Sequence, residues 1–174
     1  MSRHRWVSIG VPEARKGLRV LIWLVILTCA LLPTAEYARA GEAPPITRDL
    51  RADGAGAARE HLPLLLFFTL ADCPYCARVR REYLGPMSLD ADQAKRVLIR
   101  ELPIEASVTG FDGAPHSARE IAARYKVNLF PTVVMVDAHG TEIAEPLVGF
   151  SSPDFYGGLL DGRIDTANEK IRQN

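Results

Sequence analysis

The chain has 174 residues, 48% of them hydrophobic, with 21 basic and 21 acidic residues. This length and composition support one compact domain of ordinary size with its own core. The balanced charge excludes a broad basic surface of the kind that binds nucleic acid, so we expect no nucleic-acid partner.

Residues 1–40 have the composition of a secretory signal peptide. Basic residues precede the apolar run 20–32, VLIWLVILTCALL, and Ala38-Arg39-Ala40 matches a small-residue cleavage site. The run is shorter than the roughly 20 apolar residues that span a bilayer, so a retained membrane anchor is the less favoured alternative, as is a lipid on Cys29. We therefore expect a periplasmic protein. Cleavage would leave 15 basic and 19 acidic residues, a net charge of −4.

Cleavage would also leave Cys73 and Cys76 as the only cysteines of the mature chain. Residues 41–60 are predicted to form an N-terminal segment and a loose helix, since Gly54 and Gly56 interrupt its helix-forming composition. The unbroken apolar run 64–70, LLLFFTL, predicts a strand covered on both faces of a sheet.

A helix is predicted to carry the two cysteines. Asp72 is its candidate N-cap, Pro74 falls in its first turn, and Gly85-Pro86 is predicted to end it. Arg78, Arg80 and Arg81 are expected to form a solvated face of this helix. Glu101 and Glu105 have no sequence neighbour that suggests carboxylate chemistry.

The remaining elements are predicted in chain order. They are a short helix at 89–96, a strand at 97–102, a loop with Gly110 and Gly113, a helix at 117–126 begun by a capping box, paired strands at 131–137 and 141–150 with Pro146 at an edge or bulge, and a last helix from 152 that glycines weaken. This order predicts an α/β fold over residues 61–174, with a central mixed β-sheet flanked by helices.

Two separated motifs resemble the thioredoxin superfamily, and the similarity covers about residues 60–160. They are Cys73-Pro74-Tyr75-Cys76 after a buried strand and Phe130-Pro131-Thr132 at the start of a later strand. The resemblance implies a thioredoxin-like fold and thiol–disulfide exchange without a cofactor. It implies Cys73 as nucleophile and Cys76 as resolving thiol, with Pro74 and Tyr75 as motif residues. It also implies a cis-proline at Pro131, preceded by a substrate-contacting Phe130.

The segments LFPTVVMVDAHGTEI and GFSSPDFYGGLLDG are similar to exported thioredoxin-like proteins associated with bacterial sulfur oxidation. This similarity favours a reductase of disulfide-containing or thiol-containing exported proteins, supplied with electrons by a membrane thiol donor. The chain departs from thioredoxin at Phe67, which stands where thioredoxin has a buried aspartate.

The chemistry of the pair depends on its position at a helix N-terminus. Unpaired N–H groups and the helix dipole there lower the pKa of Cys73, while the charge of Asp72 opposes the effect. Whether the pair reduces or forms disulfides depends on its reduction potential, which the residues do not specify.

Three other roles compete with redox exchange for the two cysteines, namely a structural disulfide, a zinc site and a copper(I) site. A purely structural disulfide is disfavoured because so short a loop constrains the unfolded chain little. A zinc site lacks ligands, because His61, His116 and His139 are isolated in sequence. A copper(I)-binding module that uses the same two thiolates is the alternative function.

Overall fold

The computed structural model describes residues 43–173. The predicted signal peptide, residues 1–40, lies outside the described residues. Within residues 43–173, no helix combines the length and the apolar composition that a membrane crossing requires. The strands are β1 (Leu64–Thr69), β2 (Leu98–Pro103), β3 (Ser107–Thr109), β4 (Pro115–Ser117), β5 (Thr132–Val136) and β6 (Glu142–Val148). The helices are α2 (Leu50–Glu60), α3 (Pro74–Val79), the π-helix η1 (Arg80–Leu84), α4 (Gly85–Leu89), the 3-10 helix η2 (Gln93–Lys95), α5 (Ala118–Arg124) and α6 (Pro153–Gln173).

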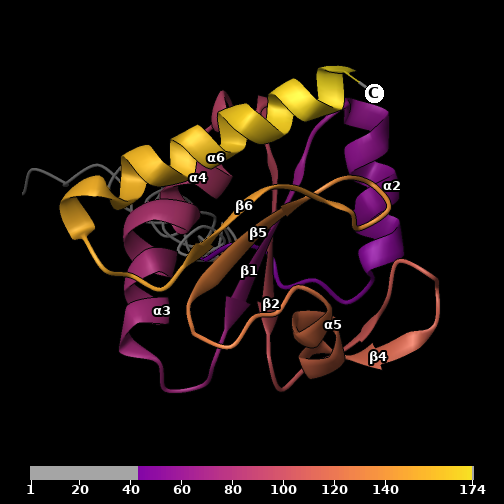
Figure 1. Cartoon of the computed structure of the whole chain (residues 1–174), viewed down its shortest axis with the longest axis horizontal. Coiled ribbons are helices and arrows are strands. Elements are labelled where there is room, and N and C mark those ends of the chain that lie inside the picture. Colours follow the sequence, from indigo (N-terminus) through magenta and orange to yellow (C-terminus); the bar gives the residue numbers. More distant parts are fainter. Residues whose placement is uncertain (1–42, 174) are drawn as a thin grey trace, which may run out of the picture. The chain divides into compact units, whose positions relative to one another are not determined.

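A four-stranded mixed sheet in the order β2-β1-β5-β6 forms the centre of the fold (Figure 1). β1 pairs in parallel with β2 and antiparallel with β5, and β6 is antiparallel to β5. All six residues of β1 are buried, as expected for an apolar run covered on both faces. The predicted α/β class and central mixed sheet are confirmed.

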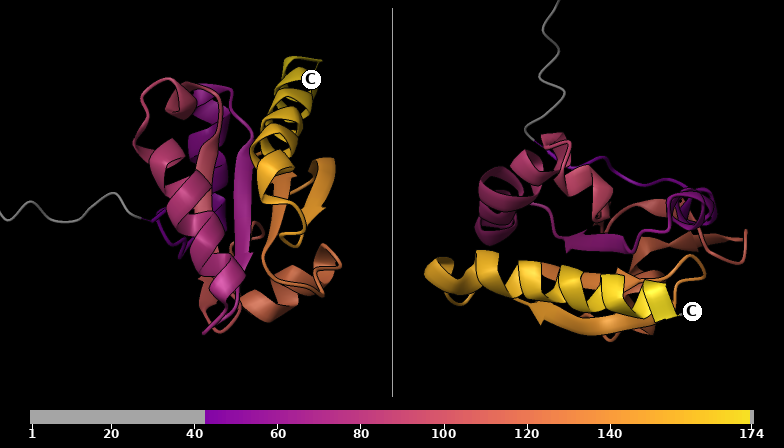
Figure 2. Two further views of the ribbon diagram at one scale, coloured as in Figure 1. Left: turned by 90° about the vertical axis from the view of Figure 1, so that its left-hand side faces the viewer. Right: turned by 90° about the horizontal axis from the view of Figure 1, so that it is seen from above.

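The two faces of the sheet bury separate sets of side chains. Leu65 and Phe67 pack with residues of α3 and α6, whereas Leu64, Leu66 and Phe68 pack with residues of α2 and α5. This division follows from the strand period of two, which sends alternate side chains to opposite faces. Both views of Figure 2 show α6 running alongside β6.

The helix predicted before the first strand is present as α2, but it is continuous through its glycines, so the prediction that it is loose is wrong. The Asp49 side chain accepts the N–H of Ala52 at 2.9 Å and caps the helix. Gly54 is buried, and a Cβ at this position would lie 2.2 Å from the carbonyl oxygen of Ala138. The glycine therefore permits a close approach between α2 and the turn after β5.

The helix that carries the cysteines does not end at Gly85-Pro86, and this prediction is also wrong. After α3, the chain widens into the π-helix η1 and continues as α4 to Leu89. Pro86 falls in the first turn of α4, where its missing N–H costs little. Residues 93–95 then form one 3-10 turn in place of the short helix predicted at 89–96.

The segment predicted as a glycine-containing loop holds the short hairpin β3–β4, which packs beside α5 (Figure 1). The predicted capping box of α5 is confirmed, because the Glu120 N–H donates to Ser117 Oγ and the Ser117 N–H donates to the Glu120 carboxylate. Helix α6 runs unbroken to Gln173 despite its glycines.

Strand β6 is at the edge of the sheet, as Pro146 predicts. Its register with β5 shifts between the pairs Val133–Leu147 and Met135–Ala144, so two residues of β6, Glu145 and Pro146, lie opposite Val134. This is a β-bulge, one of the few positions in a sheet that tolerates proline.

Candidate active site

Cys73 and Cys76 form a disulfide with a Cα–Cα distance of 5.2 Å. Cys73 is the N-cap of α3, and its Sγ accepts the backbone N–H of Cys76 at 3.1 Å. The predicted N-cap, Asp72, does not cap the helix. It has a left-handed φ of 55° and makes the turn between β1 and α3. Capping by the sulfur places it among the unpaired N–H groups of the helix N-terminus, which stabilise a thiolate when the pair is reduced.

The four motif residues differ in exposure. Cys76 is 1% exposed and belongs to the core between the sheet and helices α3 and α6, while Cys73 is partly buried against that core. Pro74 is exposed, and Tyr75 is 58% exposed. An incoming disulfide can therefore reach Cys73 and the surface of Pro74 and Tyr75 before it can reach Cys76.

The Phe130–Pro131 peptide lies at the same end of the sheet as the cysteines. Phe68, near the end of β1, pairs with Thr132 at the start of β5, so the loops that follow β1 and precede β5 are neighbours. The Phe130–Pro131 bond is cis, and the Pro131 carbonyl accepts the Gly149 N–H at 2.8 Å. Phe130 packs against the same core as Cys73 and Cys76.

An aromatic cluster extends from the motif toward α6. The Tyr75 and Phe150 rings have centroids 6.3 Å apart, and Phe150 also packs against Tyr83 and Tyr156. The Arg78 guanidinium lies 5.1 Å from the centroid of the Phe150 ring, a cation–π contact. Phe150 follows β6 and is far from the motif in sequence, so no local pattern predicts that it belongs to the site.

An ion pair between the buried Glu101 and the partly exposed Arg80 lies beside the motif, and it corrects the expectation that Arg80 is solvated. Glu101 of β2 is 2% exposed, and both its carboxylate oxygens accept N–H groups of Arg80. Thr69 Oγ1 donates to the same carboxylate at 2.9 Å. The hydrogen bonds to Glu101 raise the pKa of Arg80 above its ordinary value, so the guanidinium carries its charge throughout the physiological range. Arg81, in contrast, is solvated, as expected.

Glu101 occupies the strand position opposite Phe67. Since Ile99 and Phe67 both belong to the core that contains Cys76, alternation along β2 directs Glu101 to the same face of the sheet. The face that lacks a carboxylate at Phe67 therefore has one on the neighbouring strand.

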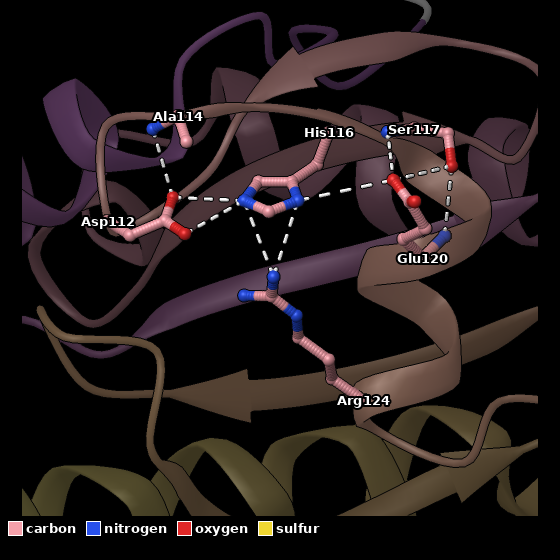
Figure 3. A network of polar contacts seen from close by, with 6 residues as sticks. All are labelled: Asp112, Ala114, His116, Ser117, Glu120 and Arg124. Carbon is pink, nitrogen blue, oxygen red and sulfur yellow. Dashed lines mark hydrogen bonds and ion pairs between the residues drawn. The ribbon is translucent and has the colours of Figure 1, made fainter.

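His116 belongs to a polar network on β4 and α5 rather than to a metal site (Figure 3). Its Nε2 lies 2.8 Å from Asp112 Oδ2, and both ring nitrogens lie 3.3 Å from the Arg124 guanidinium. Across residues 43–173, no three His, Cys, Asp or Glu side chains are grouped so that they could hold a metal ion together. A copper(I) site made of Cys73 and Cys76 alone would not require such a group.

The site can perform thiol–disulfide exchange with its own atoms. It holds an accessible sulfur at a helix N-terminus and a second, buried sulfur that is bonded to the first. These are the parts that nucleophilic attack on a disulfide and resolution of the resulting mixed disulfide require.

Comparisons with known proteins agree with this architecture. The family described as "Thioredoxin-like domain" matches residues 50–161, more than half of the chain, from α2 into α6. No curated protein sequence matches the chain.

Several solved structures are similar in fold. The reduced periplasmic thioredoxin SoxS from Paracoccus pantotrophus is 22% identical, with 60% of this chain and 98% of that chain covered and a TM-score of 0.42. The oxidised C-terminal domain of DsbD from Neisseria meningitidis is 17% identical, with coverages of 68% and 98% and a TM-score of 0.47. A thioredoxin-like protein from Clostridium perfringens is 18% identical, with coverages of 76% and 91% and a TM-score of 0.48.

The family assignment rests on the match over residues 50–161, and the activity on the family together with the cysteine pair. The chain belongs to the thioredoxin-like domain family and, with its Cys73–Cys76 disulfide, is a thiol–disulfide oxidoreductase.

Proposed function

We propose that the chain is a periplasmic reductase of disulfides in exported proteins. The observation that carries the proposal is the difference in solvent exposure between the two bonded cysteines. Cys73 is partly exposed at the helix N-cap, and Cys76 is 1% exposed behind it. The reducing direction and the exported partners are proposed from the resemblance of the segments around Pro131 and Phe150, and the periplasmic location from the composition of residues 1–40.

Reduction proceeds through two exchanges. The Cys73 thiolate attacks one sulfur of the substrate disulfide, so a Cys73–substrate bond forms, the substrate S–S bond breaks, and the second substrate sulfur leaves as a thiolate that takes a proton. Cys76, once deprotonated, then attacks the Cys73 sulfur and releases the first substrate sulfur. Two electrons have passed to the substrate, and the Cys73–Cys76 disulfide is left.

Phe130 and Pro131 are proposed to bind the substrate chain beside Cys73, with Pro74 and Tyr75 on the facing side. The loop is held by the Pro131 carbonyl, which accepts from Gly149, and by Thr132 Oγ1, which donates to the Leu129 carbonyl at 2.7 Å. A membrane thiol donor is proposed to reduce the Cys73–Cys76 disulfide by the reverse sequence of exchanges. No cofactor takes part in this scheme.

Replacement of the resolving thiol tests the proposal. The Cys76→Ala variant, exported in cells, should accumulate mixed disulfides through Cys73, visible as reductant-sensitive high-mass bands and identifiable by mass spectrometry. The Cys73→Ala variant is the matched control and should trap none. Absence of covalent partners in the Cys76→Ala strain would contradict the proposal.

The copper(I) alternative predicts a different result. It requires tight copper(I) binding by the reduced pair, together with no exchange activity on a model disulfide. Exchange activity with weak copper binding would leave thiol–disulfide exchange as the function of the pair.

A further inference from the structure

Among the acidic and basic residues within 43–173, Glu101 alone is buried, with 2% of its surface exposed. A charge at such a position is costly unless it is paired and hydrogen-bonded. Glu101 meets both conditions, because Arg80 donates from Nε to Oε2 at 2.9 Å and from a terminal nitrogen to Oε1, and Thr69 also donates to Oε1. Each charge of the pair is thus held in place by the other.

Arg80 also lines a pocket that Cys73 shares. Cys73, Ala77 and Arg80 follow one another at helical spacing and line one pocket beside the motif. Asp72 lines the same pocket, and Glu105 lies nearby, since its carboxylate accepts the Ala71 N–H at 3.3 Å. The charge that Cys73 experiences on this side therefore depends on Arg80 and on how far Glu101 compensates it.

Stability alone does not account for such a pair. Replacing a buried ion pair with apolar residues of similar size is often neutral or stabilising, so the presence of such a pair is weak evidence for a role in stability. Its charges act at longer range than its contacts, because the surrounding protein screens them less than water does.

We propose that Arg80 and Glu101 are a charge-balanced pair that sets the reduction potential of Cys73–Cys76, an inference that rests on the proposed redox function. On reduction, Cys73 becomes a thiolate. The Arg80 cation favours that thiolate and hence the reduced form, and the Glu101 anion offsets this effect. Removing either partner alone should shift the potential, and the two removals should shift it in opposite directions.

The test is the equilibrium with glutathione, in which the oxidised protein and reduced glutathione give the reduced protein and glutathione disulfide. Glu101→Gln, which leaves Arg80 uncompensated, should raise this equilibrium constant by about threefold to tenfold, and Arg80→Gln should lower it by a similar factor. The double variant should return to within about twofold of the wild type, because the two opposite shifts cancel.

Two further measurements separate this role from a structural one. The Cys73 thiolate pKa, followed by ultraviolet absorbance, should fall in Glu101→Gln and rise in Arg80→Gln. The matched control is Arg81→Gln, which removes the same charge from the neighbouring exposed position and should leave the glutathione equilibrium unchanged.

If Arg80→Gln does not fold, Glu101→Gln is compared with the double variant, because these two differ only in the Arg80 charge. The single variant should then be the more oxidising. Equal potentials for all folded variants, or shifts of one sign, would overturn the inference. That failure is distinct from failure of the proposed function, which would show as absent mixed disulfides in cells while the glutathione equilibrium of the purified variants still shifted.

Discussion

Cys73 and Cys76 share one disulfide but occupy different environments, since Cys76 is 1% exposed in the core and Cys73 is partly exposed at the helix N-cap. A reduced Cys73 is therefore both more accessible and better stabilised as a thiolate than a reduced Cys76.

The two thiols should differ in their reaction with an alkylating reagent. In reduced protein near neutral pH, Cys76→Ala should be alkylated at Cys73 at least about tenfold faster than Cys73→Ala is alkylated at Cys76, because the thiolate is the reactive form and burial blocks access. Stopped reactions analysed by mass spectrometry give both rates. In strong denaturant the rates should become similar, and a difference that persisted there would have a cause other than the fold.

The approach of α2 to the turn after β5 predicts opposite effects at two glycines of one helix. Gly54→Ala places a Cβ against the Ala138 carbonyl oxygen and should lower the free energy of unfolding by about 1–3 kcal/mol. Gly56→Ala meets its neighbours only at ordinary contact distance, 3.7 Å or more, and should raise it by about 0.5–1 kcal/mol through helix propensity. Urea unfolding of both variants tests the pair, and a stabilised Gly54→Ala would contradict the packing described for α2.

Two tyrosines of the aromatic cluster should respond differently to loss of the hydroxyl. The Tyr156 hydroxyl is buried with no hydrogen-bond partner among residues 43–173, and burial raises the pKa of this phenol. Tyr156→Phe should therefore leave stability unchanged or raise it by up to about 1 kcal/mol. Tyr83 donates to the Pro153 carbonyl at 2.8 Å, so Tyr83→Phe should cost about 0.5–1.5 kcal/mol. Thermal unfolding at neutral pH distinguishes the two, and equal losses would refute the distinction.

The capping box of α5 predicts a pH-dependent contribution to stability. The Ser117 N–H and hydroxyl, both hydrogen-bonded to Glu120, hold its pKa below the ordinary value of 4.5. Because the folded pKa is depressed, the stabilisation is fully present above pH 4.5 and is lost as the pH falls through the folded pKa.

Glu120→Gln should therefore be less stable than the wild type at neutral pH, and the two should converge in acid. Ser117→Ala serves as the comparison, since it removes the capping hydroxyl and should cost about 1 kcal/mol at neutral pH. Urea midpoints measured across the acid range give both curves. A difference between Glu120→Gln and the wild type that stayed constant into strong acid would exclude the carboxylate as its source.

Local sequence patterns were sufficient for much of the fold. The LLLFFT run predicted β1, and the box formed by Ser117 and Glu120 predicted α5 within two residues, because each signal lies within the element that it specifies. The hairpin β3–β4 was missed because its strands have three residues each, too short for a periodic pattern. The helix that carries the cysteines was predicted to end at Gly85-Pro86 because glycine and proline commonly end helices. The π-helix η1, which joins α3 to α4, has no sequence signal.

The site was partly predictable for the same reason. The CPYC motif and Phe130-Pro131 are local signatures, and their proximity follows from the resemblance. The Arg80–Glu101 pair is not local, since the partners are 21 positions apart and meet only when η1 packs over β2. A lone glutamate in a strand is indistinguishable in sequence from a solvated one until the strand's neighbours are known.

The bulge at Pro146 bears on how the protein behaves among other chains. An exposed edge strand offers unpaired N–H and carbonyl groups to which a foreign strand can add, and long flat edges promote aggregation. In β6, proline removes one donor and the bulge breaks the regular spacing of the others. This edge of the sheet is thereby protected from intermolecular strand addition.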